Sequence, residues 1–404
     1  MVEASGDNYQ KRAALFRAGN PTRLAFFRVH QFIGLVVGAI FVLIGLSGGI
    51  LAFREDIDEW LNAPLMRVEA PEQGVFQSPD AILATAQAAL PPDAKLDRLT
   101  MPRHRHVAAI VSYMTETDDL DSYFYEMFVD PYTGKVKGRR VSLHGEDTFS
   151  QPLIRILMTF HWTLLLGVNN AYIIGAAGIL LFASVLIGVY LWWPRGGEWR
   201  LGFKVKWGAS RERVVYDLHR SAGAYMGAVL LVMLATGVAM IFKPATRAAV
   251  SRFSTVRPDP DFGKSTPAQG QAPIGLGAAI AAADKIFPDG SVFWVVLPNA
   301  PNGVYVVGKQ ASDEPSRSRT FRNVSVDQYS GKVLQVQDRG DFTAGERFLE
   351  WLYPLHSGEA FGDIGRPIIL LIGLTPLLLY VTGFMRWRGK RRARRRIQGV
   401  TVLR

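Results

Sequence analysis

Four of the seven histidines in this chain recur at equivalent places in its two halves. His30 and His219 each open a long apolar run, whereas His161 and His356 each stand ahead of another such run. Neutral imidazole is a common metal ligand and the usual axial ligand of haem iron. If the halves are related by an approximate twofold axis, equivalent histidines face each other and form two His–His pairs. Two such pairs are suited to hold two b-type haems without a covalent link.

Glycines accompany two of these histidines at the spacing of a helix. One stands four residues and another eight residues after His30, and the same holds for His219. These glycines are Gly34, Gly38, Gly223 and Gly227. Each shares a helix face with its histidine, so together they could leave room for a porphyrin plane. Glycine at this spacing also serves close packing of membrane helices, and this second interpretation stays open.

The remaining candidate site residues are four arginines and one further histidine. The arginines that could hold haem propionates are Arg28 and Arg220 near the first pair, and Arg155 and Arg366 near the second. His144 is an alternative to His161 as the ligand that completes the second pair. Ligation of another metal by the same pairs is the competing interpretation, although zinc usually takes three or four protein ligands.

The composition excludes several other kinds of redox and metal chemistry. The chain has no cysteine, which rules out iron–sulfur clusters, thiolate zinc sites, disulfides and covalent c-type haem. It also has no G-x-G-x-x-G loop after a strand and no Walker loop, so no nicotinamide or flavin site is indicated. Electrons must therefore come from a cytosolic partner or from a quinol.

Four apolar runs are long enough to position these side chains in a bilayer, whose core needs roughly 20 helical residues. The predicted spans are Val29–Phe53, Ala171–Trp193, Tyr216–Phe242 and Ile364–Trp387. Pro376 should kink the last one. The net charge of +11 is concentrated beside these runs, at 11–28, 195–213 and 386–396. Such clusters mark cytosolic segments rather than a nucleic-acid surface, so both termini and the middle loop are predicted to be cytosolic.

Two long segments are predicted to be α+β units on the periplasmic side. Residues 54–155 show a helix start at Ser78-Pro79-Asp80 and strand patterns at 107–113, 123–129 and 135–141. Residues 243–350 show a helix at 275–286 and strand patterns at 292–297, 304–308, 319–326 and 332–337. The segment Asp130-Pro-Tyr-Thr-Gly134-Lys-Val136 recurs as Asp327-Gln-Tyr-Ser-Gly331-Lys-Val333, which indicates an internal repeat.

The predicted fold is therefore an α-helical membrane bundle of four transmembrane helices with two extracytoplasmic α+β domains and an internal twofold repeat. The predicted segments are a cytosolic N-terminal segment (1–28), the first span (29–53), the first periplasmic domain (54–155), an interfacial segment with the second span (156–193), a cytosolic basic loop (194–215), the third span (216–242), the second periplasmic domain (243–350), an interfacial segment with the fourth span (351–388) and a basic cytosolic tail (389–404). The expected location is the bacterial inner membrane.

Several motifs carry a resemblance that covers nearly the full chain. They are Val29-His30-Gln31-x2-Gly34, Phe160-His161-Trp-x-Leu164-Leu-x-Gly167, Tyr190-Leu-Trp-Trp-Pro194, Leu218-His219-Arg220-x2-Gly223 and Trp351-Leu-Tyr-Pro-Leu355-His356. In these motifs the chain resembles the PepSY-associated transmembrane family, an iron-regulated group that includes inner-membrane ferric-siderophore reductases. The resemblance implies two PepSY-like domains, two b-type haems and reduction of Fe(III) in a periplasmic siderophore. It also implies that His30, His219, His161 and His356 are the axial haem ligands.

The expected function is that of a di-haem b oxidoreductase. It would take electrons from a cytosolic donor or the quinol pool and pass them across the lipid bilayer to a ferric siderophore. Three other functions stay open: a non-enzymatic PepSY sensor or regulatory protein, a siderophore or metal permease, and a haem-dependent quinol oxidoreductase with another acceptor. The glycine-rich, sparsely charged spans argue against the permease.

Overall fold

The computed structural model describes residues 21–116, 122–144, 147–194, 199–267 and 270–401. The predicted cytosolic N-terminal segment lies outside these residues up to position 20, as do positions 195–198 of the basic loop and 402–404 of the tail. The chain divides into two compact units. The helix unit contains Met1–Ala52, Phe160–Thr246 and Leu355–Arg404, and the sheet unit contains Phe53–Thr159 and Arg247–Pro354.

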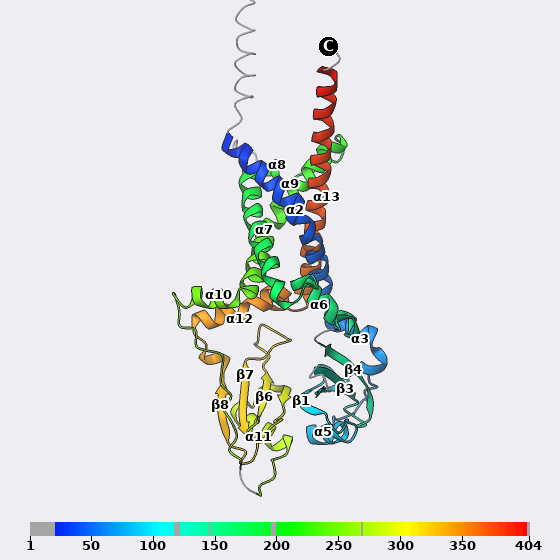
Figure 1. The fold of residues 1–404 in the computed structure, drawn as a ribbon, viewed down its shortest axis with the longest axis vertical. Coiled ribbons are helices and arrows are strands. Elements are labelled where there is room, and N and C mark those ends of the chain that lie inside the picture. The colour runs from blue at the N-terminus through cyan, green and yellow to red at the C-terminus, as the bar shows by residue number, and fades with distance from the viewer. Residues whose placement is uncertain (1–20, 117–121, 145–146, 195–198, 268–269, 402–404) are drawn as a thin grey trace, which may run out of the picture. The chain divides into compact units, whose positions relative to one another are not determined.

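Four long helices run side by side in the helix unit (Figure 1). They are α2 (Pro21–Leu51), α7 (Ala171–Trp192), α9 (Arg211–Ile241) and α13 (Gly362–Thr401). The helices α2 and α9 each pack against both α7 and α13. Each of the four contains, or continues, a stretch with a mean hydropathy of 2.1–2.4 that is long enough to cross a membrane. The four predicted spans are therefore present as helices of the required length and composition.

Hydropathy did not predict where α9 begins or how closely α2 and α13 pack. The helix α9 begins at Arg211, five residues before the predicted span, because the Ser210 hydroxyl caps it by accepting from the Arg213 amide at 3.4 Å. The helix α13 continues through Pro376, and the kink expected there stays a prediction. A Cβ atom added at Gly45 would lie 2.7 Å from the Gly373 carbonyl oxygen, so these glycines allow α2 and α13 to touch.

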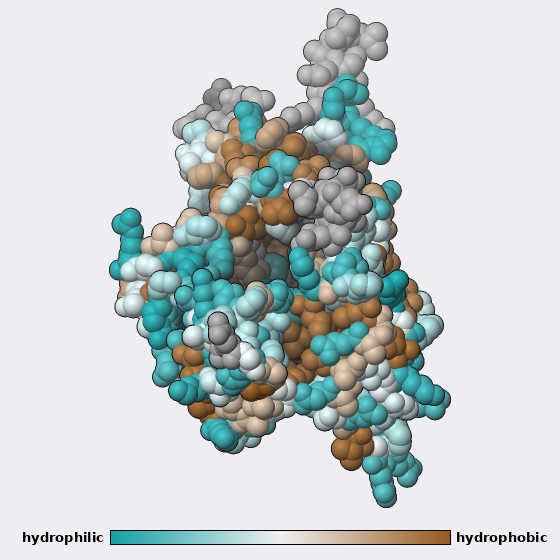
Figure 2. Space-filling view, turned by 60° about the horizontal axis from the view of Figure 1, so that its bottom comes forward, coloured by the Kyte–Doolittle hydropathy of each residue, from teal (hydrophilic) through white to brown (hydrophobic). Residues whose placement is uncertain are grey.

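The outward surface of the long helices is apolar, as a lipid environment requires. On α2, for example, Phe32, Val36 and Leu43 are all more than half exposed. Figure 2 shows such apolar surface on the helices and hydrophilic surface over much of the sheet unit. Two shorter helices precede α7 and α13 in the chain, namely α6 (Leu153–Thr163) and α12 (Ala344–Ser357).

The sheet unit is built on an eight-stranded antiparallel sheet with the order β4-β3-β2-β1-β5-β6-β7-β8. Its strands are β1 (Lys95–Thr100), β2 (Ala109–Glu116), β3 (Ser122–Val129), β4 (Val136–His144), β5 (Ser291–Val296), β6 (Val304–Gln310), β7 (Arg322–Asp327) and β8 (Val333–Gln337). The seven strands predicted from sequence all form, with ends within three residues of the prediction. The strand β1 was not predicted, because Lys95-Leu-Asp-Arg-Leu-Thr100 is mostly polar.

Strands from both predicted α+β segments, 54–155 and 243–350, belong to this one sheet. The strands β1 and β5 pair across the boundary, with Leu99 opposite Val295. An unpaired edge strand exposes a row of hydrogen-bonding groups, and this pairing removes one such edge from each half. The two halves therefore depend on each other for a complete sheet.

One face of the sheet carries the main hydrophobic core. The helices α5 (Pro79–Ala88) and α11 (Leu276–Ile286) pack on this face and contact each other. Ile82 on α5 and Leu276 on α11 are almost wholly buried, together with Val295, Val307 and Val324 of the strands. Burial of such side chains contributes about 1.5–3 kcal/mol each.

The repeated sequence segment forms the same turn in both halves. The Asp130 carboxylate accepts from the backbone amides of residues two and three places on, and the Asp327 carboxylate does the same at 2.9 and 2.7 Å. Gly134 and Gly331 close the two turns with φ angles of +70° and +69°. A glycine is needed there because the left-handed region disfavours other residues.

Candidate functional site

The structure places the four candidate histidines in two adjacent pairs. His30 on α2 lies beside His219 on α9, with ring centres 6.3 Å apart and ring planes at 76°. His161 on α6 lies beside His356 on α12, with ring centres 6.2 Å apart and ring planes at 58°. These are the pairs that the internal repeat predicts, and each contains one histidine from either half of the chain.

The two pairs lie far apart along the same helix. His30 stands near the start of α2, whereas the ring of His161 contacts Ile44 and Ser47 near the end of that helix. At a rise of 1.5 Å per residue these two levels are roughly 20–25 Å apart. The helix unit therefore has one His–His pair toward each end.

The Nδ1 atom of every paired histidine is hydrogen-bonded to a backbone carbonyl of a neighbouring helix. The four contacts are His30 with Ser184 at 2.9 Å, His161 with Ile44 at 3.0 Å, His219 with Leu379 at 3.1 Å and His356 with Met233 at 3.2 Å. A carbonyl oxygen only accepts, so each Nδ1 carries a hydrogen and each Nε2 of the neutral ring keeps its lone pair. Metal-ligating histidines are oriented by this kind of hydrogen bond.

A hydroxyl group stands beside each of these carbonyls. The distances to Nδ1 are 3.0 Å from Ser184, 3.1 Å from Ser47, 2.9 Å from Thr382 and 3.0 Å from Thr236. In the last three cases the hydroxyl also lies within hydrogen-bond reach of a carbonyl of its own helix. A hydroxyl that donates there is free to accept from Nδ1, so it supports the same tautomer.

A glycine lies against each of the four rings. A Cβ atom would come within 2.7–3.4 Å of the ring Cε1 atom at each of these positions. The glycines and the histidines they contact are Gly48 and His161, Gly188 and His30, Gly237 and His356, and Gly383 and His219. Larger residues at these positions would push the imidazoles out of place. These glycines were not singled out as site residues from sequence, although their constant offset from the histidines was visible.

At the four predicted glycines, an added Cβ atom would not touch a histidine ring. A Cβ atom at Gly34 would meet nothing within 4 Å, and one at Gly223 would first meet a Leu379 methyl group at 4.0 Å. Gly38 and Gly227 leave ordinary contact distances of 3.6 and 3.5 Å. The same open space thus lies at equivalent positions in both halves, near the first histidine pair.

The spacing of the rings would suit two imidazoles that hold one metal ion. A metal–imidazole bond is about 2.0 Å and a ring centre lies roughly 1.1 Å behind its nitrogen, so the centres of two such rings would be roughly 6.2 Å apart. Both pairs have this spacing. Within the described residues no cluster of three or more His, Cys, Asp or Glu could hold a metal ion.

The four predicted arginines do not gather at the rings. Arg28 and Arg155 are exposed on α2 and α6. Arg220 donates to the Leu201 and Lys204 carbonyls and forms an ion pair with Asp217. Arg366 donates from Nε to the Ala52 carbonyl at 3.1 Å. The last two therefore hold backbone segments in place, and a propionate role for all four stays a prediction.

Arg386 is a site residue that sequence reasoning missed. It lies on α13, three residues after Gly383, and interacts electrostatically with both His30 and His219. Its guanidinium lies 4.6 Å from the ring centre of Tyr216 and is partly buried. The signal was present in the sequence, because Arg386 directly precedes Trp387, whereas its repeat equivalent before Trp192 is the apolar Leu191.

His144 belongs to a different environment. It ends β4 in the sheet unit, and its ring stacks on Tyr123 with centres 3.9 Å apart. Its Nδ1 accepts from the Asp147 amide at 3.0 Å, which is the opposite polarity to that in the four paired histidines. The structure therefore pairs His161, and not His144, with His356.

Comparison with known proteins supplies the family. No curated protein matches the chain. A family profile that describes the PepSY-associated TM region matches residues 27–390. The match contains all four paired histidines and both halves of the sheet. Because it extends over nearly the whole chain, this membrane protein belongs to the PepSY-associated TM family.

Proposed function

We propose that this chain is a di-haem b oxidoreductase of the bacterial inner membrane that reduces a ferric siderophore on the periplasmic side. The observation that supports this proposal most directly is the repeated His–His pair. In each pair the ring centres are 6.2–6.3 Å apart, and both Nε2 atoms keep a lone pair that can bind a metal. Each pair therefore has the ligands for one b-type haem. When bound, these haems supply iron that takes up and releases one electron at a time.

The contribution of the chain is placement and orientation. The helix α2 carries His30 near its start, and near its end it carries the Ile44 carbonyl and the Ser47 hydroxyl that orient His161. One rigid element therefore sets the distance between the two sites. The ring-contacting glycines give the imidazoles room against the helices, and an added Cβ atom at Gly34 or Gly223 would meet no atom closer than 4.0 Å.

The proposed electron transfer to the ferric chelate needs no acid or base from the protein. A quinol is oxidised to a quinone and gives up two electrons and two protons. The protons pass to water, and each electron reduces one Fe(III) to Fe(II). Fe(III) is the harder ion and favours the oxygen ligands of a siderophore, so reduction weakens the chelate and releases the metal. A soluble cytosolic reductant is the other class of donor that fits the predicted orientation.

The test is iron reduction by the purified chain in proteoliposomes. A reduced quinol is supplied, the ferric siderophore is placed on the sheet-unit side, and Fe(II) is trapped with a ferrous-specific chelator. We expect reduction by the natural protein and at least a tenfold loss in His30→Ala and in His356→Ala. His106→Ala is the matched control, because His106 is exposed in the sheet unit, and it should retain full activity.

The outcomes separate the other functions. A protein that contains haem and accepts electrons from quinol but leaves the ferric siderophore untouched would be an oxidoreductase with another acceptor. A protein that folds without haem would be a PepSY sensor or regulatory protein instead.

A further inference from the structure

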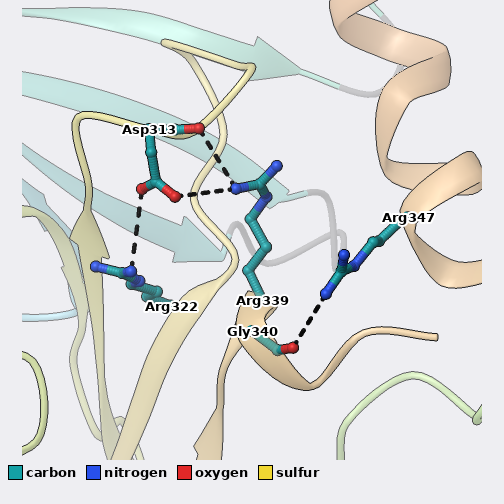
Figure 3. Close-up of a pocket in the computed structure, with 5 residues that line it drawn as sticks. All are labelled: Asp313, Arg322, Arg339, Gly340 and Arg347. Carbon is teal, nitrogen blue, oxygen red and sulfur yellow. Dashed lines mark hydrogen bonds and ion pairs between the residues drawn. The ribbon is translucent and has the colours of Figure 1, made fainter. Parts of the chain in front are cut away.

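A cavity of about 270 Å³ opens on the second half of the sheet unit. The residues that line it are Asp313, Arg322, Arg339, Gly340 and Arg347 (Figure 3). They come from the loop between β6 and β7, from β7, from the turn after β8 and from α12. Three of the five are arginines, so the lining is basic, and the proposed haem sites do not involve any of them.

Two of the arginines are anchored from behind by carboxylates outside the lining. The Nη1 atom of Arg322 donates to Asp289 at 2.8 Å, and the Nε atom of Arg339 donates to Glu350, which is 4% exposed. The buried Glu350 fixes the direction of the Arg339 guanidinium before any ligand arrives, whereas Asp289 is 65% exposed and holds Arg322 more weakly. The Nε atom of Arg322 is buried without a hydrogen-bond partner, since the nearest carboxylate, Asp338, is 3.9 Å away.

A carboxylate of the protein already bridges the two anchored arginines, but loosely. Asp313 lies 3.3 Å from Nη1 of Arg339 and 3.9 Å from Nη2 of Arg322. Its side chain is 65% exposed, so this bridge contributes little and a better-placed anion could displace it. The third arginine, Arg347, donates to the Gly340 carbonyl at 3.3 Å and forms no ion pair within the described chain.

The internal repeat shows that the fold itself does not require these arginines. When the repeated turns at Asp130 and Asp327 are aligned, Tyr125 takes the place of Arg322 and Ser142 takes the place of Arg339. Both halves nevertheless form the same four-stranded arrangement. The basic cavity is therefore an addition to the second half alone.

We propose that this cavity binds a small polycarboxylate anion. One carboxylate replaces Asp313 between Arg322 and Arg339, and another reaches Arg347. The planar fork of a guanidinium matches a carboxylate in two parallel hydrogen bonds, which favours this class of ligand. The same chemistry occurs in a free polycarboxylate and in a ferric chelate with carboxylate arms. If the ligand is the ferric chelate, the inference rests on the proposed function and identifies carboxylate-bearing chelates as its substrate class.

The test is calorimetric titration of the full chain in nanodiscs with citrate, with acetate as the single-carboxylate comparison. Citrate should bind and acetate should bind far more weakly. Arg347→Gln should weaken citrate binding about tenfold or more, because one charged hydrogen-bond donor is lost. Arg252→Gln, which removes an exposed arginine of the same unit, should leave binding unchanged. Asp313→Asn should tighten binding, because it removes the competing carboxylate.

Ga(III)–citrate, which has no accessible reduction, tests whether the chelate is bound as well as the free anion. Binding of citrate without binding of Ga(III)–citrate would overturn the substrate-class part. No binding of citrate, or equal losses in Arg347→Gln and Arg252→Gln, would overturn the whole inference. Haem content is measured on the same samples, so a protein that holds two haems but no citrate would leave the proposed function standing.

Discussion

The His30–His219 pair and the His161–His356 pair share their ring geometry and differ in their charged surroundings. Their ring centres are 6.3 and 6.2 Å apart, and all four Nδ1 atoms meet a carbonyl and a hydroxyl group. Arg386 acts electrostatically on both rings of the first pair. Within the described residues, no arginine or lysine acts in this way on the second pair.

Each site must both hold an iron and set its redox potential, and the two pairs differ in features that affect only the potential. Ring spacing and Nδ1 partners decide whether an iron is held by two imidazoles, and these features are repeated. A nearby cation favours the reduced form of an iron centre, because reduction adds negative charge. The two sites should therefore bind alike and differ in redox potential.

Removal of an imidazole should have the largest effect. Substitution of His30, His219, or both by alanine should cost the same single haem, about half of the absorbance per protein, because each pair acts as a unit. His30→Ala combined with His356→Ala should cost both haems. If each of the four single variants instead lost only a quarter of the haem absorbance, the pairing would be contradicted.

Filling the open space should abolish binding at the first pair alone. Gly34→Phe puts a ring where a Cβ atom meets nothing within 4 Å, so the bundle should fold but exclude a porphyrin there. Gly389→Phe is the matched control, since Gly389 is also helical and also faces open space. The haem-to-protein ratio should halve in the first variant and stay constant in the second. Equal ratios in both would mean that the space at Gly34 is not a cofactor space.

Loss of a hydroxyl should have a smaller effect and should lower the haem affinity of the second pair. Thr236→Val removes one of the two Nδ1 partners of His356 and retains the Met233 carbonyl. Partners of this kind contribute about 10–100-fold to metal affinity. Thr375→Val removes a buried hydroxyl that bonds only to its own helix and should change nothing. Transfer of haem to an apoprotein acceptor measures the affinity, and equal transfer from both variants would refute the role of Thr236.

The smallest expected effect concerns charge. Arg386→Gln should lower the midpoint potential of the first site and leave the second unchanged, with both haems still bound. Arg386→Lys should restore most of the potential, since it keeps the charge. A spectroscopic redox titration resolves the two sites, and a shift of both or of neither would remove the proposed distinction between them.

The sequence predicted the pairing of the histidines because they occur at one constant offset in each half. It could not predict the carbonyls of Ile44 and Met233 as partners, since a backbone group carries no sequence signal and its position depends on helix packing. Arg28 and Arg366 were chosen for their nearness in sequence, whereas Arg386 reaches the site because α13 packs against α9. The joining of the two sheet halves was missed for a similar reason. The polar strand β1 has no alternating apolar pattern in its sequence, and it forms because it pairs with β2 and β5.

The account depends most on whether the two pairs bind haem. The direct measurement is a reduced-minus-oxidised visible spectrum of the purified natural protein, with haem quantified as the pyridine haemochrome. Two b-type haems per chain, in a low-spin state with two imidazole ligands, are the predicted result. A colourless protein, purified after expression with an adequate supply of haem, would contradict the account.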